Sequence, residues 1–87
     1  MKYIVLVRVG PDGIDCPYCV KAQELLNKKN LNYKLIAFNS NHDDLLQQIK
    51  DAFEWKTIPM IFSKEEQLVR FVGGYTDLIS LFDDNEQ

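Results

Sequence analysis

The stretch Cys16-Pro17-Tyr18-Cys19 stands where the chain passes from a β-strand to a helix, and it contains both cysteines of the protein. The apolar, β-branched run at residues 3–7 predicts a buried strand, and the amphipathic pattern that begins just past Cys16 predicts a helix. Cys16 therefore falls at or near the helix N-cap, where unpaired N–H groups and the positive end of the helix dipole favour a thiolate. Pro17 suits the first helical position, because its fixed φ fits the turn and its missing N–H is not needed there.

The spacing of the two cysteines predicts reversible disulfide chemistry. Helical side chains three residues apart lie on one face, with Cβ atoms about 5–6 Å apart, so Cys16 and Cys19 can form a disulfide. So small a ring stabilises the fold only slightly, since the entropic gain grows with loop length and tight geometry adds strain. We therefore expect a bond that forms and breaks during function. Cys16 is the expected nucleophile, and Cys19, one turn into the helix, is the expected resolving thiol.

The same motif is also half of a zinc site, and at the level of the motif this alternative stays open. Zinc would need two more ligands, and the sequence offers no third cysteine and a single histidine, His42. A complete site would require a second chain. We expect redox chemistry, with no metal ligand and no tightly bound cofactor in this chain. His42 is expected to start or cap a helix, because it has no acidic or metal partner in view.

Length and composition predict one small domain, residues 1–87, with an adequate but modest core. Hydrophobic residues make up 46% of the chain, yet no apolar run approaches the about 18 residues of a membrane helix, and no signal peptide is in view. We expect a protein of the reducing cytoplasm, without a membrane partner, where a cysteine pair is usually catalytic. The formal charge of −3 argues against nucleic-acid binding.

The hydrophobic pattern predicts an α/β protein with the element order βαβ-αββα. Strands are expected at residues 2–9, 33–38, 59–63 and 68–72, and helices at 17–29, 43–53 and 76–82. The first two strands should be parallel because a helix joins them, and the last two should form an antiparallel hairpin. Residues 10–13 are expected to form a turn-rich loop.

Apolar positions at helical spacing predict the core. The residues expected to be buried on the first helix are Cys19, Ala22, Leu25 and Leu26. Those expected on the second helix are Leu45, Leu46, Ile49, Ala52 and Phe53. All five phenylalanines are core candidates, namely Phe38, Phe53, Phe62, Phe71 and Phe82. Asn30 suits the end of the first helix, and Trp55 is expected to pack at the edge of the site.

Three segments together resemble the glutaredoxin family, in particular its dithiol members of the small bacterial or phage-like form. The segments are Cys16-Pro17-Tyr18-Cys19, Thr57-Ile58-Pro59 and Gly73-Gly74-Tyr75-Thr76-Asp77. They stand in the family's order and spacing, and the resemblance covers nearly the whole chain. It implies a thioredoxin fold, with a four-stranded mixed sheet of order 4-3-1-2, strand 3 antiparallel, flanked by three helices on both faces.

The resemblance also implies a glutathione site. A cis bond between Ile58 and Pro59 would present the backbone of Ile58 beside Cys16 to an extended peptide such as glutathione; from the residues alone, Pro59 could simply begin a strand with a trans bond. The binding residues implied are Tyr18, Thr57, Ile58, Pro59, Tyr75, Thr76 and Asp77. Those in supporting positions are Pro17, Lys21, Gly73 and Gly74.

The third segment is the part of this site expected to bind charged groups. The N–H groups of Thr76 and Asp77 would take the γ-glutamyl carboxylate, the Asp77 side chain would take the ammonium, and Tyr18 and Tyr75 would flank the tripeptide. Gly73 and Gly74 would allow the close approach. An ordinary glycine turn before a capped helix would account for the two glycines and Thr76 equally well.

One position departs from the family pattern. Many glutaredoxins carry a basic residue three positions before the first cysteine, where this chain has Gly13. Asp12 and Asp15 stand nearby, and their carboxylates would oppose ionisation of Cys16. Arg8 or Lys21 is expected to compensate. Lys21 matches a family basic position just after the motif, whereas Arg8 is more often simply a charge at the end of a strand.

The function expected is that of a monomeric, glutathione-dependent thiol–disulfide oxidoreductase. It would reduce protein disulfides, with ribonucleotide reductase suggested by the resemblance, and glutathione mixed disulfides. Two alternatives remain open. One is a redoxin of the ribonucleotide-reductase type that thioredoxin reductase reduces, which the missing basic residue favours and the segment at residues 73–77 argues against. The other is a non-enzymatic metal or iron–sulfur module shared by two chains.

Overall fold

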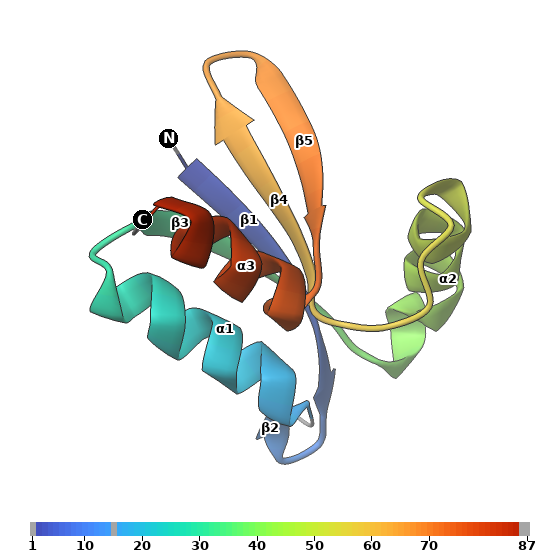
Figure 1. The fold of residues 1–87 in the computed structure, drawn as a ribbon. Coiled ribbons are helices and arrows are strands. Elements are labelled where there is room, and N and C mark those ends of the chain that lie inside the picture. Colours follow the sequence, from blue (N-terminus) through green and yellow to red (C-terminus); the bar gives the residue numbers. More distant parts are fainter. Residues whose placement is uncertain (1, 15, 86–87) are drawn as a thin grey trace.

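The computed structural model describes residues 2–14 and 16–85, with side chains described as far as Phe82 (Figure 1). Its elements are β1 (Lys2–Gly10), β2 (Gly13–Ile14), α1 (Pro17–Lys28), β3 (Asn32–Phe38), the 3₁₀ turn η1 (Ser40–His42), α2 (Asp43–Ala52), β4 (Met60–Glu65), β5 (Leu68–Gly73) and α3 (Tyr75–Asn85). All seven predicted elements are present, with ends that differ from the prediction by at most three residues. Within the described part of the chain, no helix is long and apolar enough to cross a membrane.

The sheet is built around β1. This strand pairs in parallel with β3 and antiparallel with β4, and β4 pairs antiparallel with β5. The long strands therefore lie in the order β5-β4-β1-β3. A fifth strand, β2, was not predicted: it pairs antiparallel with the end of β1, Val9 opposite Ile14 and Gly10 opposite Gly13. The loop expected at residues 10–13 is thus the corner of a small hairpin.

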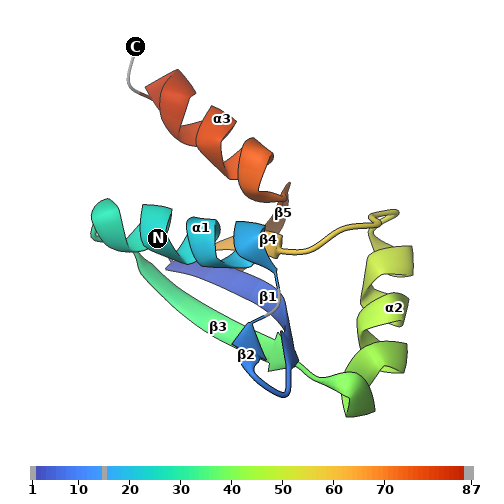
Figure 2. The ribbon, with the colours of Figure 1, turned by 90° about the horizontal axis from the view of Figure 1, so that it is seen from below.

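The two faces of the sheet carry separate cores because successive strand residues point to opposite sides. On one face, Tyr3, Val5 and Val7 of β1 pack against α1 and α3, and Figure 2 shows both helices on this side of the sheet. The residues that complete this core are Cys19, Ala22, Leu26, Ile61, Leu78 and Phe82. The core of the other face consists of Leu6, Phe38, Leu46, Met60 and Phe62.

The end of α1 confirms the role predicted for Asn30. This residue adopts a positive φ of 57°, which asparagine tolerates better than most residues. Its N–H donates to the carbonyl of Asn27 at 3.0 Å, and the N–H of Leu31 donates to the carbonyl of Leu26 at 3.0 Å. These two hydrogen bonds form a Schellman motif, which satisfies carbonyls at the end of the helix and turns the chain towards β3.

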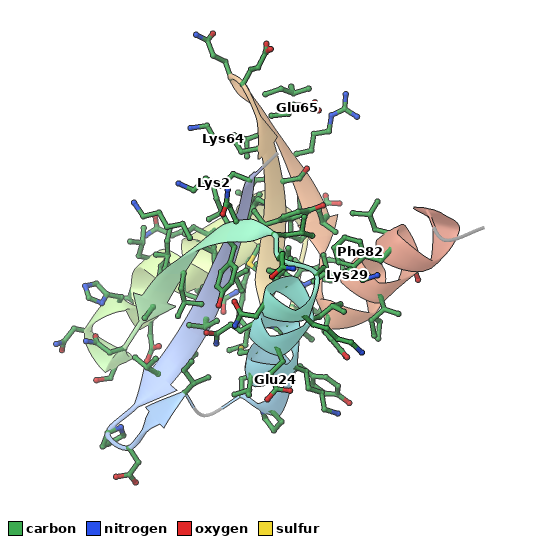
Figure 3. The ribbon with its side chains drawn as sticks, turned by 90° about the vertical axis from the view of Figure 1, so that its left-hand side faces the viewer. Lys2, Glu24, Lys29, Lys64, Glu65 and Phe82 are labelled. Carbon is green, nitrogen blue, oxygen red and sulfur yellow. The ribbon has the colours of Figure 1, made fainter. Side chains whose placement is uncertain are left out.

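The C-terminal end of α1 contacts α3. The Nζ atom of Lys29 lies 5.3 Å from the centre of the Phe82 ring, a distance suited to a cation–π interaction, and Figure 3 shows the two side chains together. The Phe82 ring also meets the Tyr3 ring edge to face, with centroids 6.2 Å apart. One side chain of α3 thus joins both α1 and the sheet.

The second face is covered less completely than predicted. On α2, Leu46 is buried and Ile49 is partly buried, but Leu45 is 50% exposed and Ala52 is also exposed. Phe53, which follows the helix, is 45% exposed. The prediction of a buried face was therefore wrong for these three residues. In Figures 1 and 2, α2 lies beside one end of the sheet rather than across its middle, so only part of its apolar stripe reaches the sheet.

Candidate active site

Cys16 occupies the N-cap of α1, as its position in the sequence predicted. Its backbone is extended, with φ −100° and ψ 114°, and its Sγ accepts a hydrogen bond from the N–H of Cys19 at 3.3 Å. The same sulfur lies 3.5 Å from the carbonyl oxygen of Ile58, to which the thiol donates. Cys16 is partly exposed, so its sulfur can be reached from outside the protein.

Cys19 lies in a different environment only one turn away. Its side chain is fully buried in the core beneath α1, and it is a free thiol, as is Cys16. Burial raises the pKa of Cys19 to about 12, and its hydrogen bond to Cys16 and the charge of Cys16 act in the same direction. Backbone N–H groups at Arg8 and at Cys19 itself partly oppose this rise in pKa. The pair therefore combines an accessible sulfur with a sheltered, protonated one.

The peptide bond between Ile58 and Pro59 is cis, as the resemblance implied. Pro59 is fully buried immediately before β4, while Ile58 is partly buried. The carbonyl of Ile58 faces the sulfur of Cys16. Two segments about forty residues apart in the sequence thus meet at the reactive sulfur.

A cavity of about 300 Å³ opens beside this meeting point. Its lining consists of Tyr18, Trp55, Thr57, Ile58, Pro59, Gly74, Tyr75, Thr76 and Asp77. All seven residues expected to contact glutathione are in this set, although their assignment to glutathione remains a prediction. A larger hollow of about 580 Å³ lies between β5 and α3 and also touches Asp77, but its lining does not include Ile58, whose carbonyl faces the Cys16 sulfur.

Two tyrosines form one wall of the smaller cavity. The rings of Tyr18 and Tyr75 have centroids 6.0 Å apart and are tilted by 36°. Lys21 places its Nζ 5.2 Å from the centre of the Tyr18 ring, within the range of a cation–π interaction. This contact holds a positive charge close to the cavity, although Lys21 does not line it.

Asp77 and Gly74 also line this cavity, and Gly73, the last residue of β5, directly precedes them. The Oδ2 atom of Asp77 accepts a hydrogen bond from the N–H of Gly74 at 2.9 Å, so this side chain caps the start of α3. Gly73 has a φ of 126°, and a Cβ at this position would overlap the Asp77 carboxylate. Only glycine fits both constraints. The cap leaves Oδ1 of Asp77 as the oxygen available to a ligand.

Comparison with known proteins decides the family. The family model described as Glutaredoxin matches residues 13–68, which is more than half of the chain. This chain belongs to the glutaredoxin family. Glutaredoxin 1 of Rickettsia typhi is 39% identical over 74 residues, which cover 79% of this chain and 64% of that protein. Human glutaredoxin-1 is 35% identical over 74 residues, which cover 76% of this chain and 63% of that protein.

A solved structure supports the fold of this glutaredoxin. Reduced Escherichia coli glutaredoxin superimposes with a TM-score of 0.67, at 24% sequence identity, over 98% of this chain and 96% of that one. At this level of identity, the comparison supports the shared fold rather than a shared substrate.

The position that departs from the glutaredoxin pattern lies in the β1–β2 hairpin. Gly13 is exposed in β2 with a φ of 116°, and Asp12 is exposed at the hairpin corner, whereas Asp15 lies outside the described residues. Arg8 does not point to Cys16: its guanidinium donates to Asp43 of α2 at 2.8 and 3.2 Å and to the carbonyl of Val9. Of the two basic residues considered, Lys21 is the one held near the cavity.

Trp55 is the site residue that sequence reasoning underestimated. It was expected only to pack at the edge, yet its indole lines the cavity. The ring packs between Gly74 and the Phe71 ring. A Cβ added at Gly74 would lie 3.6 Å from the Trp55 Cζ2 atom, and the centroids of the Trp55 and Phe71 rings are 5.1 Å apart. The one available signal was its position, two residues before Thr57.

His42 is the remaining residue singled out from the sequence. It occupies the N-cap position of α2, as expected, but makes no hydrogen bond there with its side chain. Its ring instead packs edge to face against Phe38, with centroids 6.4 Å apart. Within residues 2–14 and 16–85, no group of three or more His, Cys, Asp and Glu side chains is placed to hold a metal ion.

Proposed function

We propose that this chain is a glutathione-dependent thiol–disulfide oxidoreductase that uses Cys16 and Cys19 to reduce protein disulfides and glutathione mixed disulfides. The observation that carries the proposal is the contrast between the two thiols. Cys16 is partly exposed at a helix N-terminus beside the Ile58 carbonyl, and Cys19 is buried with its pKa raised to about 12. Membership of the glutaredoxin family supports the same chemistry.

The reaction begins at the Cys16 sulfur. As a thiolate, it attacks one sulfur of the substrate disulfide, forms a mixed disulfide and releases the other sulfur as a thiolate, which takes up a proton. Cys16 is now uncharged, so its charge no longer helps to raise the pKa of Cys19. Cys19 can then lose its proton more easily, attack the Cys16 sulfur and release the second substrate thiol. The product is a Cys16–Cys19 disulfide.

Glutathione would complete the cycle in two steps. One molecule attacks the Cys16–Cys19 disulfide and forms a mixed disulfide with Cys16, and a second releases glutathione disulfide and the reduced protein. The α3 N-terminus presents N–H groups of Thr76 and Asp77 that suit the γ-glutamyl carboxylate, and Oδ1 of Asp77 suits the ammonium. In the mixed disulfide, Cys16 has no proton to donate, so the Ile58 carbonyl is released to accept an N–H of the bound tripeptide.

The cellular setting completes the proposal. A dithiol that must return to the reduced form suits the cytoplasm, where the glutathione pool is reducing. Disulfide-containing proteins such as ribonucleotide reductase are the proposed protein partners, and a monomer is the proposed working state.

Two serine variants test the mechanism. In an assay coupled to glutathione reductase and NADPH, Cys16→Ser should be inactive towards every disulfide, because it lacks the attacking sulfur. Cys19→Ser should still reduce a glutathionylated peptide, which needs only Cys16, while losing activity towards protein disulfides that require both thiols. The reverse pattern would exchange the two roles. Reduction of the oxidised protein by thioredoxin reductase but not by glutathione would refute the glutathione dependence.

A further inference from the structure

The indole of Trp55 holds a polar group that the free protein leaves unused. Its Nε1 atom is buried and has no hydrogen-bond partner among the described residues, and Trp55 is the single tryptophan of the chain. Buried donors are normally paired, because an unpaired one loses its hydrogen bonds to water without replacement. Because Trp55 lines the cavity, a ligand in the cavity is a candidate partner for this donor.

The surroundings of this indole suggest the answer. Three groups surround Gly74 at one corner of the cavity. Their distances from the position that a Cβ of Gly74 would occupy are 3.6 Å for Trp55 Cζ2, 3.7 Å for the Pro59 carbonyl oxygen and 4.0 Å for Asp77 Oδ2. Cζ2 is joined to the ring carbon that carries Nε1, so the N–H lies near this corner too. The first N–H groups of α3 begin at the same place. The corner therefore places the indole and the α3 N–H groups, which can donate to an anionic group, beside two acceptors, the Pro59 carbonyl and the Asp77 carboxylate.

We propose that Trp55 is a ligand-binding residue whose indole N–H donates to the γ-glutamyl carboxylate of glutathione. The inference rests on the proposed function, since it takes glutathione as the ligand. In the complex, Nε1 donates to the carboxylate beside the N–H groups of Thr76 and Asp77. The donor is unsatisfied in the free protein and satisfied in the complex, so it raises affinity by making the empty state less favourable.

This arrangement predicts a loss of affinity without a matching loss of stability in Trp55→Phe, which keeps one aromatic ring and removes the N–H. The variant should unfold at nearly the temperature of the parent, because loss of a buried unpaired donor offsets the packing lost with the smaller ring. Its KM for a glutathionylated peptide should rise roughly tenfold, the effect of losing one hydrogen bond to a charged group. Its kcat should change little, because Cys16 and Cys19 are untouched.

Phe53→Leu is the matched control. Phe53 belongs to the same aromatic group, with its ring 5.2 Å from those of Phe62 and Phe71, but it does not line the cavity. It should leave KM unchanged. If Trp55→Phe instead lowers the unfolding temperature and leaves KM unchanged, the N–H points at the Phe71 ring and serves packing, which overturns the inference.

Fluorescence gives a second test that needs no change at Trp55. In Cys16→Ser, which cannot form a mixed disulfide, reduced glutathione should shift the emission of the single tryptophan in a saturable way, because the indole N–H gains a charged partner. If the parent protein is active with glutathione but Cys16→Ser shows no emission shift at saturating glutathione, the role of Trp55 is overturned and the proposed function stands. If the parent protein is inactive with glutathione and Cys16→Ser does not bind it, the proposed function itself is refuted.

Discussion

At the scale of single residues, Gly73 shows how one missing Cβ supports both α3 and the candidate site. Its φ of 126° and the overlap that a Cβ would make with the Asp77 carboxylate leave no room for alanine. We expect Gly73→Ala to displace that carboxylate from the N–H of Gly74 and to lower the free energy of unfolding by about 2–3 kcal/mol. The KM for a glutathionylated peptide should rise in the same variant, because Asp77 is moved. Urea unfolding and steady-state kinetics measure the two effects.

Gly13→Ala is the matched control for this prediction. Gly13 also has a positive φ, 116°, but nothing lies within 4 Å of the position of its Cβ. This variant carries backbone strain without a collision, so it should lose about 1–2 kcal/mol of stability and keep its KM. Equal effects of the two variants on KM would show that the contact between Gly73 and Asp77 does not shape the site.

At the scale of elements, the end of α1 depends on Asn30. Because Asn30 adopts a left-handed conformation within a Schellman motif, Asn30→Ala should lower the free energy of unfolding by about 1 kcal/mol, and Asn30→Gly should leave it unchanged or raise it slightly. Lys28→Ala, at the last residue of α1, is the control and should have little effect. Urea unfolding of the three variants tests the order, and a stable Asn30→Ala would contradict it.

The elements that were predicted well are those whose signals are local. Asn30 marks the end of α1 because few other residues adopt a positive φ so readily, and Pro17 marks the start because its ring suits the first turn. The strand at residues 13–14 was missed because two residues are too short for an alternating pattern and glycine suggests a turn. Local sequence indicates only the preferred backbone conformation, whereas β2 forms because it pairs with β1.

The position of α2 depends on information that its own sequence lacks. The apolar stripe of α2 predicts that one face is buried, but it does not specify how far the helix extends over the sheet. Leu46 reaches the sheet and Leu45 does not, because α2 meets only one end of that face. The contacts of such a helix are set by the path of its connecting segments, which the helix pattern does not encode.

At the scale of the whole molecule, the candidate site brings together segments that are remote in sequence. The cysteine motif could be interpreted alone, because spacing and helix position define its chemistry. The other two segments gained meaning only through the family resemblance, since an isoleucine–proline pair or two glycines are common in any loop. The role of Trp55 was underestimated because an unpaired N–H is a property of the packed structure, and the sequence shows only the residue that carries it.

The buried thiol should also make the stability of the whole domain depend on pH. The pKa of Cys19 rises from its ordinary value of 9.0 to about 12 in the folded protein, so between these values the folded state holds a proton that the unfolded state has lost. The free energy of unfolding should therefore fall as pH rises through this window, by at most about 1.4 kcal/mol per pH unit, and not change from this cause below it. Urea unfolding of the reduced protein at several pH values measures the slope. Cys19→Ala retains every other titrating group and should lose this part of the slope; identical slopes in the two proteins would show that burial of Cys19 does not hold its proton.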